Sequence, residues 1–301
     1  MLKPRFSCWL AGWLLVLLAL PAAALPPGSH TLVLRHAEHE REFIVHVPVN
    51  YQAATPVPLV VALHGGGGHM QNMARDRLYG LVSQAEASGW IVVFPNGFSR
   101  LPGGRIATWN AGICCGAAHD TGSDDVAFLR AVVAEVQRRL NIDPQRIFAT
   151  GMSNGGMMSY RLACDAADLF RAVAAVAGTD GTTHCTPQRP VAVFHIHARD
   201  DDRVLFNGGS GQASATHANF VSVPATIEKW TRLNTCRGPA QRVLEQPGVV
   251  CEVRTSCEAE VRLCVTDSGG HAWPGGRKAL GGQGSNALDA SAAIWAFFAR
   301  Q

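Results

Sequence analysis

The stretch that decides the fold of this 301-residue chain is Ala149-Thr150-Gly151-Met152-Ser153-Asn154-Gly155-Gly156. It follows a strand-like run at 146–148 and leads into a helix-like run at 157–163. A Gly-x-Ser-x-Gly turn between a strand and a helix holds its serine on a sharp bend, with the hydroxyl pushed clear of the sheet. Side chains in place of the two glycines would collide where strand and helix pass close together. The stretch therefore predicts a nucleophile at Ser153.

Strand-like and helix-like segments alternate along the rest of the chain, and several of the strands are continuous apolar runs, as in buried parallel sheets. The expected strands are 43–47, 59–63, 91–94, 146–149, 172–177, 192–197, 249–253 and 261–265, and the expected helices are 77–87, 124–140, 155–164 and 288–299. This alternation predicts an α/β fold with a mostly parallel central sheet and helices on both faces. With the serine turn, it predicts an α/β-hydrolase fold.

The first 24 residues have the pattern of a secretory signal. Lys3 and Arg5 precede an uncharged apolar run at 9–20, and three alanines at 22–24 offer a cleavage site. The run has 12 residues, fewer than the ~20 that a membrane-spanning helix needs, so a retained anchor is the weaker alternative. We therefore expect residues 1–24 to be a signal peptide and 25–301 to be a single catalytic domain. The domain would be secreted to the medium or the periplasm, with no membrane attachment after cleavage.

The net charge of the chain gives little reason to expect a strongly charged partner such as nucleic acid. The formal net charge is +3, and the positive residues form no runs. This balance argues against nucleic acid as a partner.

An even number of cysteines in an exported chain predicts disulfides. After the signal these are Cys114, Cys115, Cys164, Cys185, Cys236, Cys251, Cys257 and Cys264. For the last four we expect Cys236 to bond Cys257 and Cys251 to bond Cys264, the second pair across a hairpin.

Cys114 and Cys115 are adjacent, and a bond between them would close a strained eight-membered ring. We therefore expect each of them to bond a distant partner, with Cys164 and Cys185 as the candidates.

Candidate partners for Ser153 lie later in the chain, in the order serine, acid, histidine that is typical of this fold. His271 stands in a glycine-rich loop after the last expected strand, and its imidazole could take the serine proton. The acid lies in the run 200–202, three aspartates just past the strand at 192–197. Spacing alone does not choose among the three.

An ester hydrolase also needs N–H donors for the oxyanion of its tetrahedral intermediate. The backbone of Asn154, directly after the nucleophile, supplies one, and the loop His64-Gly65-Gly66-Gly67-Gly68 is where the second should lie. A glycine-rich loop after a strand can instead cradle phosphate, but no Gly-Lys-Ser/Thr follows it here.

His195 and His197 support a rival hypothesis, because two histidines two residues apart on a strand share a face and could bind zinc. The remaining ligands are missing at that spacing, although His64 and Asp200 could be imagined in the role. We expect no metal and no cofactor. A third alternative is a non-catalytic, esterase-like binding protein, but such proteins usually lose a member of the triad.

Together, these motifs resemble the secreted polyhydroxybutyrate depolymerases and the feruloyl and acetylxylan esterases, a carbohydrate-esterase-1-like group of serine esterases. The resemblance is carried by the segments 63–68, 109–112, 114–116, 124–126, 151–158 and 270–275, which span nearly all of the chain after the signal.

The resemblance implies the triad Ser153, Asp201 and His271. Asp201 is chosen because His197 and Val204 fit the family pattern around its acid, although the neighbours at 198, 199, 205 and 206 depart from it. It also implies Gly66 as the second oxyanion donor, with Gly67 as the fallback. Trp109 and Trp273 are candidates to line the substrate cleft, with ordinary packing as the alternative. The expected partner is an ester substrate, either a hydroxybutyrate oligomer or an esterified plant polysaccharide.

Overall fold

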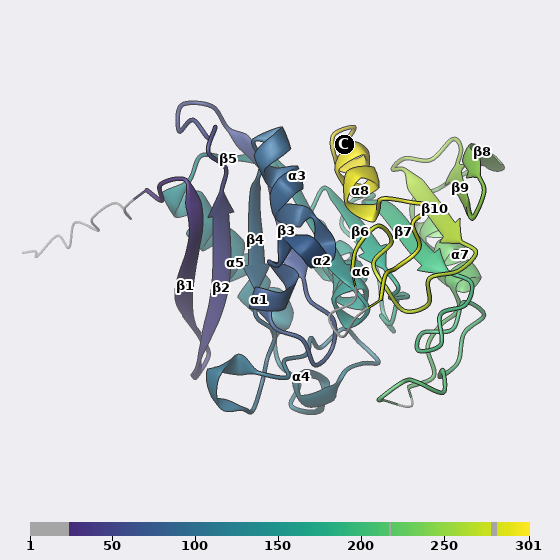
Figure 1. Ribbon diagram of the computed structural model, residues 1–301, viewed down its shortest axis with the longest axis horizontal. Coiled ribbons are helices and arrows are strands. Elements are labelled where there is room, and N and C mark those ends of the chain that lie inside the picture. Colours follow the sequence, from purple (N-terminus) through teal and green to yellow (C-terminus); the bar gives the residue numbers. More distant parts are fainter. Residues whose placement is uncertain (1–23, 217, 278–281) are drawn as a thin grey trace, which may run out of the picture.

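The chain is organised around one ten-stranded sheet, seen in a computed structural model that describes residues 24–216, 218–277 and 282–301 (Figure 1). The predicted signal peptide, residues 1–24, lies outside the described residues except for its last position. The strands are β1 (Gly28–His36), β2 (His39–Val47), β3 (Val57–Leu63), β4 (Ile91–Pro95), β5 (Ile142–Met152), β6 (Ala172–Val176), β7 (Ala192–Ala198), β8 (Ala240–Gln246), β9 (Val249–Arg254) and β10 (Val261–Thr266).

The strand order across the sheet is β1-β2-β4-β3-β5-β6-β7-β10-β9-β8. The six central strands, from β4 to β10, are parallel to one another. The pairs at the two margins are antiparallel. The carboxyl ends of the central strands therefore meet along one edge of the sheet.

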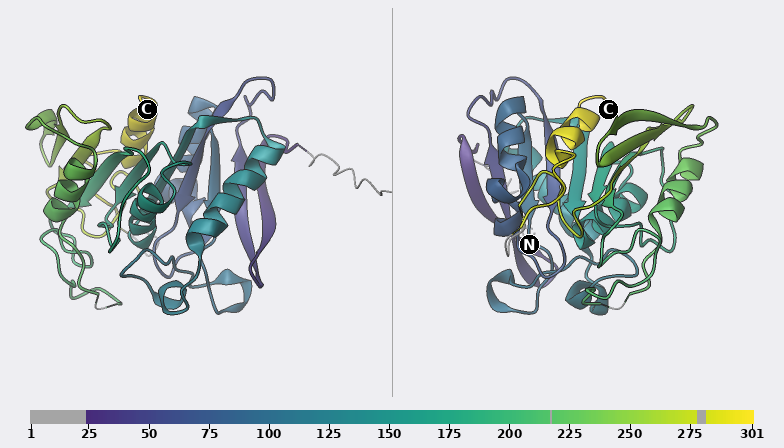
Figure 2. Two further views of the ribbon diagram at one scale, coloured as in Figure 1. Left: turned by 180° about the vertical axis from the view of Figure 1, so that it is seen from behind. Right: turned by 45° about the vertical axis from the view of Figure 1, so that its right-hand side comes forward.

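Helices cover both faces of the sheet. They are α1 (Met70–Met73), α2 (Asp76–Tyr79), α3 (Leu81–Ser88), α4 (Gly116–Asp120), α5 (Asp125–Arg139), α6 (Asn154–Asp165), α7 (Val223–Leu233) and α8 (Ala290–Phe298), with a short 3-10 turn at Pro102–Gly104. Helices α3 and α8 lie in front of the sheet in Figure 1, and α5, α6 and α7 cover the face seen from behind in Figure 2. Each face has its own apolar core. The predicted α/β fold, with helices on both sides of a mostly parallel sheet, is confirmed.

Some elements differ from those expected. The predicted helix 77–87 is divided into α2 and α3 because Gly80 adopts a left-handed conformation, with φ 67°. The sequence analysis missed the strands β1 and β8, the helix α7 and the short helices α1 and α4. The strands β1 and β8 lie at the two ends of the sheet and are only partly buried, so they lack the continuous apolar runs that identify central strands.

Four disulfides are present among the described residues. Cys236 bonds Cys257 and Cys251 bonds Cys264, as expected. The second of these pairs joins directly opposed residues of the β9–β10 hairpin.

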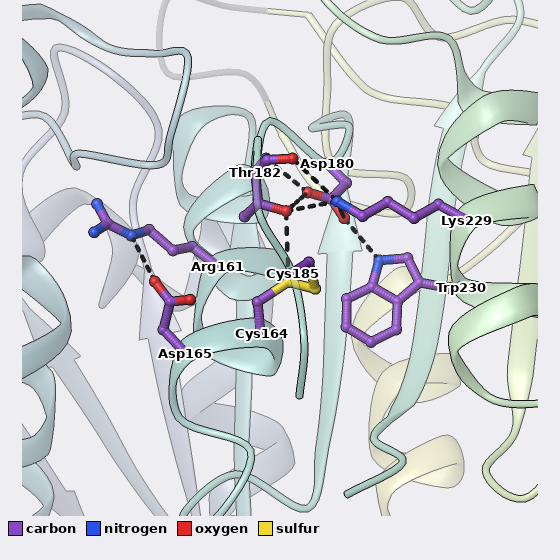
Figure 3. Close-up of a disulfide and its surroundings, with 8 residues drawn as sticks. All are labelled: Arg161, Cys164, Asp165, Asp180, Thr182, Cys185, Lys229 and Trp230. Atoms are coloured by element: carbon purple, nitrogen blue, oxygen red, sulfur yellow. Dashed lines mark hydrogen bonds and ion pairs between the residues drawn. A yellow bond between two sulfur atoms is a disulfide. The ribbon is translucent and has the colours of Figure 1, made fainter. Parts of the chain in front are cut away.

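The expectation that Cys114 and Cys115 each bond a distant partner is wrong. They bond each other, and the peptide bond between them is cis. Cys164, on α6, bonds Cys185 instead (Figure 3).

In the part of the chain that the structure describes, none of the helices combines the length and the apolar character needed to cross a membrane.

Candidate active site

Ser153 stands on a strained turn between β5 and α6. Its backbone has φ 56° and ψ −122°, a combination that L-residues rarely adopt. The turn is held by the Ser153 N–H, which donates to Val176 O at 2.8 Å. A Cβ at Gly155 would lie 2.2 Å from Leu63 O, and a Cβ at Gly151 would lie 2.5 Å from Gly155 C. The glycines are therefore required by close backbone packing, as the sequence pattern predicts.

The loops with the other candidate groups leave the sheet at the same edge. Asp201 follows β7 and His271 follows β10, and these two strands are parallel neighbours. Strand β5, which ends at the serine turn, is separated from β7 only by β6. Parallel order thus brings three segments that are far apart in the sequence to one edge.

Asp201 and His271 are in direct contact. Nδ1 of His271 lies 2.9 Å from Oδ2 and 3.1 Å from Oδ1 of Asp201. The carboxylate is buried and also accepts the backbone N–H groups of Arg203 and Val204, both at 2.9 Å. Within the described residues, Ser153 Oγ has no hydrogen bond to His271 or to any other group, and both side chains are partly exposed. Apo enzymes commonly tighten this contact only with substrate bound.

The electrostatics of Asp201 decide which ring nitrogen of His271 faces the carboxylate with a hydrogen. Burial acts to raise its pKa, but hydrogen bonds from His197 and His271 outweigh burial and hold the pKa below its ordinary value. An ionised carboxylate only accepts hydrogen bonds, so Nδ1 of His271 must carry a hydrogen. In the neutral ring, Nε2 then carries no hydrogen and has a free lone pair, which is the form that a general base needs.

The neighbouring aspartates have other roles. Asp200 accepts the backbone N–H groups of Gly269 and Gly270 at 3.3 and 2.8 Å, so it braces the loop that carries His271. The sequence did not predict this role, since a bond to a backbone 70 residues away leaves no sequence signal. Asp202 is exposed.

Two backbone N–H groups are available for an oxyanion. Asn154 is the first residue of α6, and the first N–H groups of a helix have no intrahelical acceptor. Gly66 lies beside it, because a Cβ built on Gly66 would be 3.4 Å from the Asn154 Cβ. Gly67, the fallback donor, already donates to Ala107 O at 2.9 Å. The geometry thus favours Gly66 and Asn154.

Trp109 does not line a cleft, contrary to expectation, because its side chain is 0% exposed. Its indole N–H donates to His64 O at 2.9 Å, at the start of the glycine loop. Its backbone N–H and C=O pair with the side chain of Asn154 at 2.7 and 2.9 Å. Trp109 therefore ties the glycine loop to the serine turn.

Trp273 is also buried, at 3% exposure, so its predicted place in the cleft is corrected as well. Its indole N–H donates to Ser291 Oγ at 2.9 Å, and its ring packs edge-on against Tyr79. It fixes the loop after His271 to α8. Tryptophans have both a large apolar face and one donor, so burial with a bonded N–H satisfies them as fully as a substrate would.

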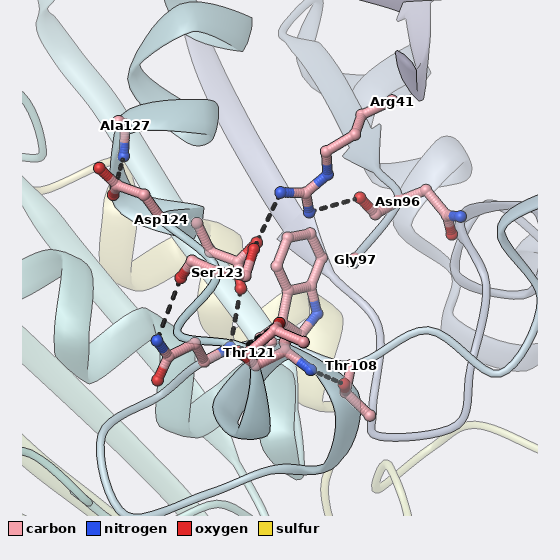
Figure 4. Close-up of polar contacts among 12 residues, drawn as sticks. Arg41, Asn96, Gly97, Thr108, Thr121, Ser123, Asp124 and Ala127 are labelled. Carbon is pink, nitrogen blue, oxygen red and sulfur yellow. Dashed lines mark hydrogen bonds and ion pairs between the residues drawn. The ribbon is translucent and has the colours of Figure 1, made fainter. Parts of the chain in front are cut away.

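A buried ion pair supports the segment that contains Trp109. Arg41 Nη1 donates to Asp125 Oδ1 at 2.6 Å, and Arg41 Nη2 donates to Asn96 O at 3.0 Å (Figure 4). The other oxygen of Asp125 accepts the Asn110 N–H at 2.7 Å. Sequence reasoning missed this pair, since 84 residues separate its members.

The histidines proposed as rival zinc ligands have their ring nitrogens engaged. His195 bonds Tyr160 and His197, while His197 bonds His195 and Val204 O. His64 donates from Nδ1 to Gly65 O and accepts the Gly97 N–H at Nε2, and burial lowers its pKa to about 4. Among the described residues, no group of three or more metal-ligating side chains is found. His64, His195 and His197 therefore do not fit the rival zinc site.

Comparison with known proteins identifies the family. The model of the family described as "Putative esterase" matches residues 35–245. The chain belongs to this esterase family. It is therefore a carboxylic ester hydrolase, and the family resemblance predicted from its motifs is confirmed.

The esterase is 32% identical over 280 residues to "Probable feruloyl esterase C" of Aspergillus clavatus, covering 90% of this chain and 88% of that protein. It is 30% identical over 244 residues to "Feruloyl esterase B" of Piromyces equi, with 77% of this chain aligned. The match spans only 42% of the Piromyces protein.

Solved structures agree on the fold of the esterase. An acetyl xylan esterase from Aspergillus awamori superposes with a TM-score of 0.57 at 15% identity, covering 77% of this chain and 89% of that one. A ferulic acid esterase from Anaeromyces mucronatus, solved with ferulic acid, gives a TM-score of 0.55 at 15% identity and covers 90% and 89%. The predicted α/β-hydrolase fold is thus confirmed.

Proposed function

We propose that this esterase cleaves its substrate through an acyl-serine intermediate on Ser153. The observation that carries the proposal is the hydrogen-bonded pair of Asp201 and His271, at the sheet edge where the strained turn presents the serine. A non-catalytic binding role is less favoured, because all three members of the triad are present.

The proton path follows from the tautomer of His271. The ionised Asp201 accepts its Nδ1–H, so Nε2 takes the proton of Ser153 as Oγ bonds to the ester carbon. Nε2 then returns this proton to the leaving alcohol, and the acyl group stays on Oγ. A water molecule then loses a proton to the same nitrogen as its oxygen bonds to the acyl carbon. When the bond from this carbon to Oγ breaks, Nε2 gives that proton back to Oγ, so the acid leaves and Ser153 is regenerated.

The backbone N–H groups of Asn154 and Gly66 would bind the oxyanion formed in each half of the reaction. Both are held by the fold rather than by flexible side chains, so they need no reorganisation when the charge develops. One such donor typically contributes 10²–10³-fold to kcat.

For the substrate, we propose feruloyl or acetyl esters of plant polysaccharide. The proposal is supported by the feruloyl esterases of Aspergillus clavatus and Piromyces equi that resemble this chain in sequence. Oligomers of 3-hydroxybutyrate, the alternative from the motif resemblance, are the competing substrate in the test below.

We also propose that residues 1–24 are a signal peptide and that residues 25–301 act as a single exported domain. The four disulfides support this proposal, because such bonds form and persist in oxidising compartments.

The test compares initial rates of the purified protein on methyl ferulate, an acetylated sugar and soluble 3-hydroxybutyrate oligomers, with Ser153→Ala as the control. We expect the protein to hydrolyse methyl ferulate or the acetylated sugar fastest, and we expect Ser153→Ala to lose this activity. A preference for hydroxybutyrate oligomers would refute the substrate assignment alone. Full activity in Ser153→Ala would refute the serine mechanism.

A further inference from the structure

A line of buried polar side chains runs behind the acid of the triad. Tyr160 Oη lies 2.9 Å from His195 Nδ1, and His195 Nε2 lies 3.0 Å from His197 Nδ1. Nε2 of His197 in turn lies 2.8 Å from Val204 O and 3.3 Å from Asp201 Oδ2. The Tyr160, His195 and His197 side chains are at most 1% exposed. The line thus joins α6 to the acid loop through β7.

The groups at the acid end set the direction of each hydrogen bond. Val204 O and the Asp201 carboxylate are acceptors only, so Nε2 of His197 carries a hydrogen. A neutral His197 then accepts at Nδ1, and His195 donates to it from Nε2. His195 in turn accepts at Nδ1, which makes the Tyr160 hydroxyl the donor. Each ring is therefore held in one tautomer by its neighbour.

The line is uncharged at its far end. Burial lowers the pKa of His195 well below its ordinary value, and the adjacent His197 acts in the same direction. Burial also raises the pKa of Tyr160 well above its ordinary value, with a further contribution from Asp180. The rings stack on one another and on Trp230 of α7, at centroid distances of 5.2–5.9 Å.

Such a line is costly to bury. Taking hydroxyl and imidazole groups out of water disfavours folding unless every donor and acceptor is matched, and apolar side chains of similar size could fill the same space without that cost. Here every ring nitrogen is matched. The arrangement gives a defined orientation at the end that touches Asp201.

We propose that Tyr160, His195 and His197 are positioning residues for ester hydrolysis, which hold the Asp201 carboxylate in the orientation that His271 requires. The proposal rests on the serine mechanism proposed above. His197 contacts both the carboxylate and the Val204 carbonyl, so it fixes the turn that presents the acid. Because Tyr160 lies on the helix that begins directly after the nucleophile, the line also couples the position of the acid to that helix.

The experiment uses two amide variants that replace different ring nitrogens. The Gln side chain of His197→Gln places its amide N where Nε2 lies, and the Asn side chain of His197→Asn places its amide N near Nδ1, out of reach of Asp201. Each variant is assayed for kcat, KM and thermal stability on an ester that the wild-type chain hydrolyses. Rates are divided by the fraction of sites labelled by a fluorophosphonate, which removes the effect of misfolded protein.

We expect His197→Asn to lower kcat per site by about 10–100-fold, the loss of one hydrogen bond to a charged group, with KM within about twofold. His197→Gln should recover to within about threefold of wild type. Equal kcat per site in both variants, at any stability, would overturn the proposal.

If neither His197 variant folds, Tyr160→Phe provides the test. A kcat per site about threefold below that of the wild type supports the proposed positioning role, and an unchanged kcat per site overturns it. Ser153→Ala run alongside separates the two claims, because only failure of the serine mechanism leaves that variant active.

Discussion

Breaking the buried ion pair beneath the Trp109 segment should destabilise the whole chain. In Asp125→Asn, the new amide group faces a donor whichever way it points, because Oδ1 accepts from Arg41 at 2.6 Å and Ser123 at 3.1 Å, and Oδ2 accepts from Asn110 at 2.7 Å. The side chain is 0% exposed, so water cannot relieve the conflict. The variant also leaves the buried Arg41 without a counter-charge.

Removing one partner of a buried pair typically costs about 3–5 kcal/mol. We expect a loss of this size in the free energy of unfolding, measured by urea denaturation as a lower midpoint with an unchanged slope. Arg41→Met should cost a similar amount. The double variant should cost about 2 kcal/mol less than the sum of the two, since it leaves neither charge unpaired.

A loss below about 1 kcal/mol in Asp125→Asn, or strict additivity in the double variant, would refute this reasoning. Such a result would mean that solvent or rearrangement compensates Arg41. Far-ultraviolet circular dichroism of each variant checks that the native state compared is the same.

The other predictions concern the acid, the pH dependence and a disulfide. Asp201→Asn should lower kcat by about 10³–10⁴-fold while the exposed neighbour variant Asp202→Asn stays within about twofold, and equal losses in steady-state assays would contradict the choice of acid. Burial lowers the pKa of His64 to about 4 in the folded chain, so on acidification the unfolded chain binds a proton at this ring at a higher pH than the folded chain does. Denaturation curves should therefore show a free energy of unfolding that is highest above about pH 6.5 and falls by about 1.4 kcal/mol per pH unit down to about pH 4. A free energy of unfolding that does not change over this range would count against a neutral buried ring. Replacing Cys251 and Cys264 by serine opens a loop with a sequence separation of 13 and should cost about 3 kcal/mol, and no change in the denaturation midpoint would show that the bond adds nothing.

Local patterns predicted much of the fold. The central strands are short apolar runs, and the turn around Ser153 has its own steric signature, so both are readable without tertiary information. The hairpin disulfide between Cys251 and Cys264 was predicted for the same reason, because the pairing of two neighbouring strands sets its register.

The positions of Trp109 and Trp273 could not be predicted from the sequence, because they depend on long-range packing. The two tryptophans assigned to the cleft are buried, because each indole N–H has a partner inside the protein, Trp109 with His64 and Trp273 with Ser291. The error at Cys114 and Cys115 is of another kind, because the small ring closed by adjacent cysteines argues against their bonding and the structure nevertheless pairs them.

The central claim, that Ser153 forms the covalent intermediate, is tested most directly by mass spectrometry of the protein after reaction with a fluorophosphonate ester. We predict one adduct per chain, on the peptide that contains Ser153, and strongly slowed labelling in His271→Ala. Adducts on another residue, or continued ester hydrolysis by protein fully labelled at Ser153, would contradict the account.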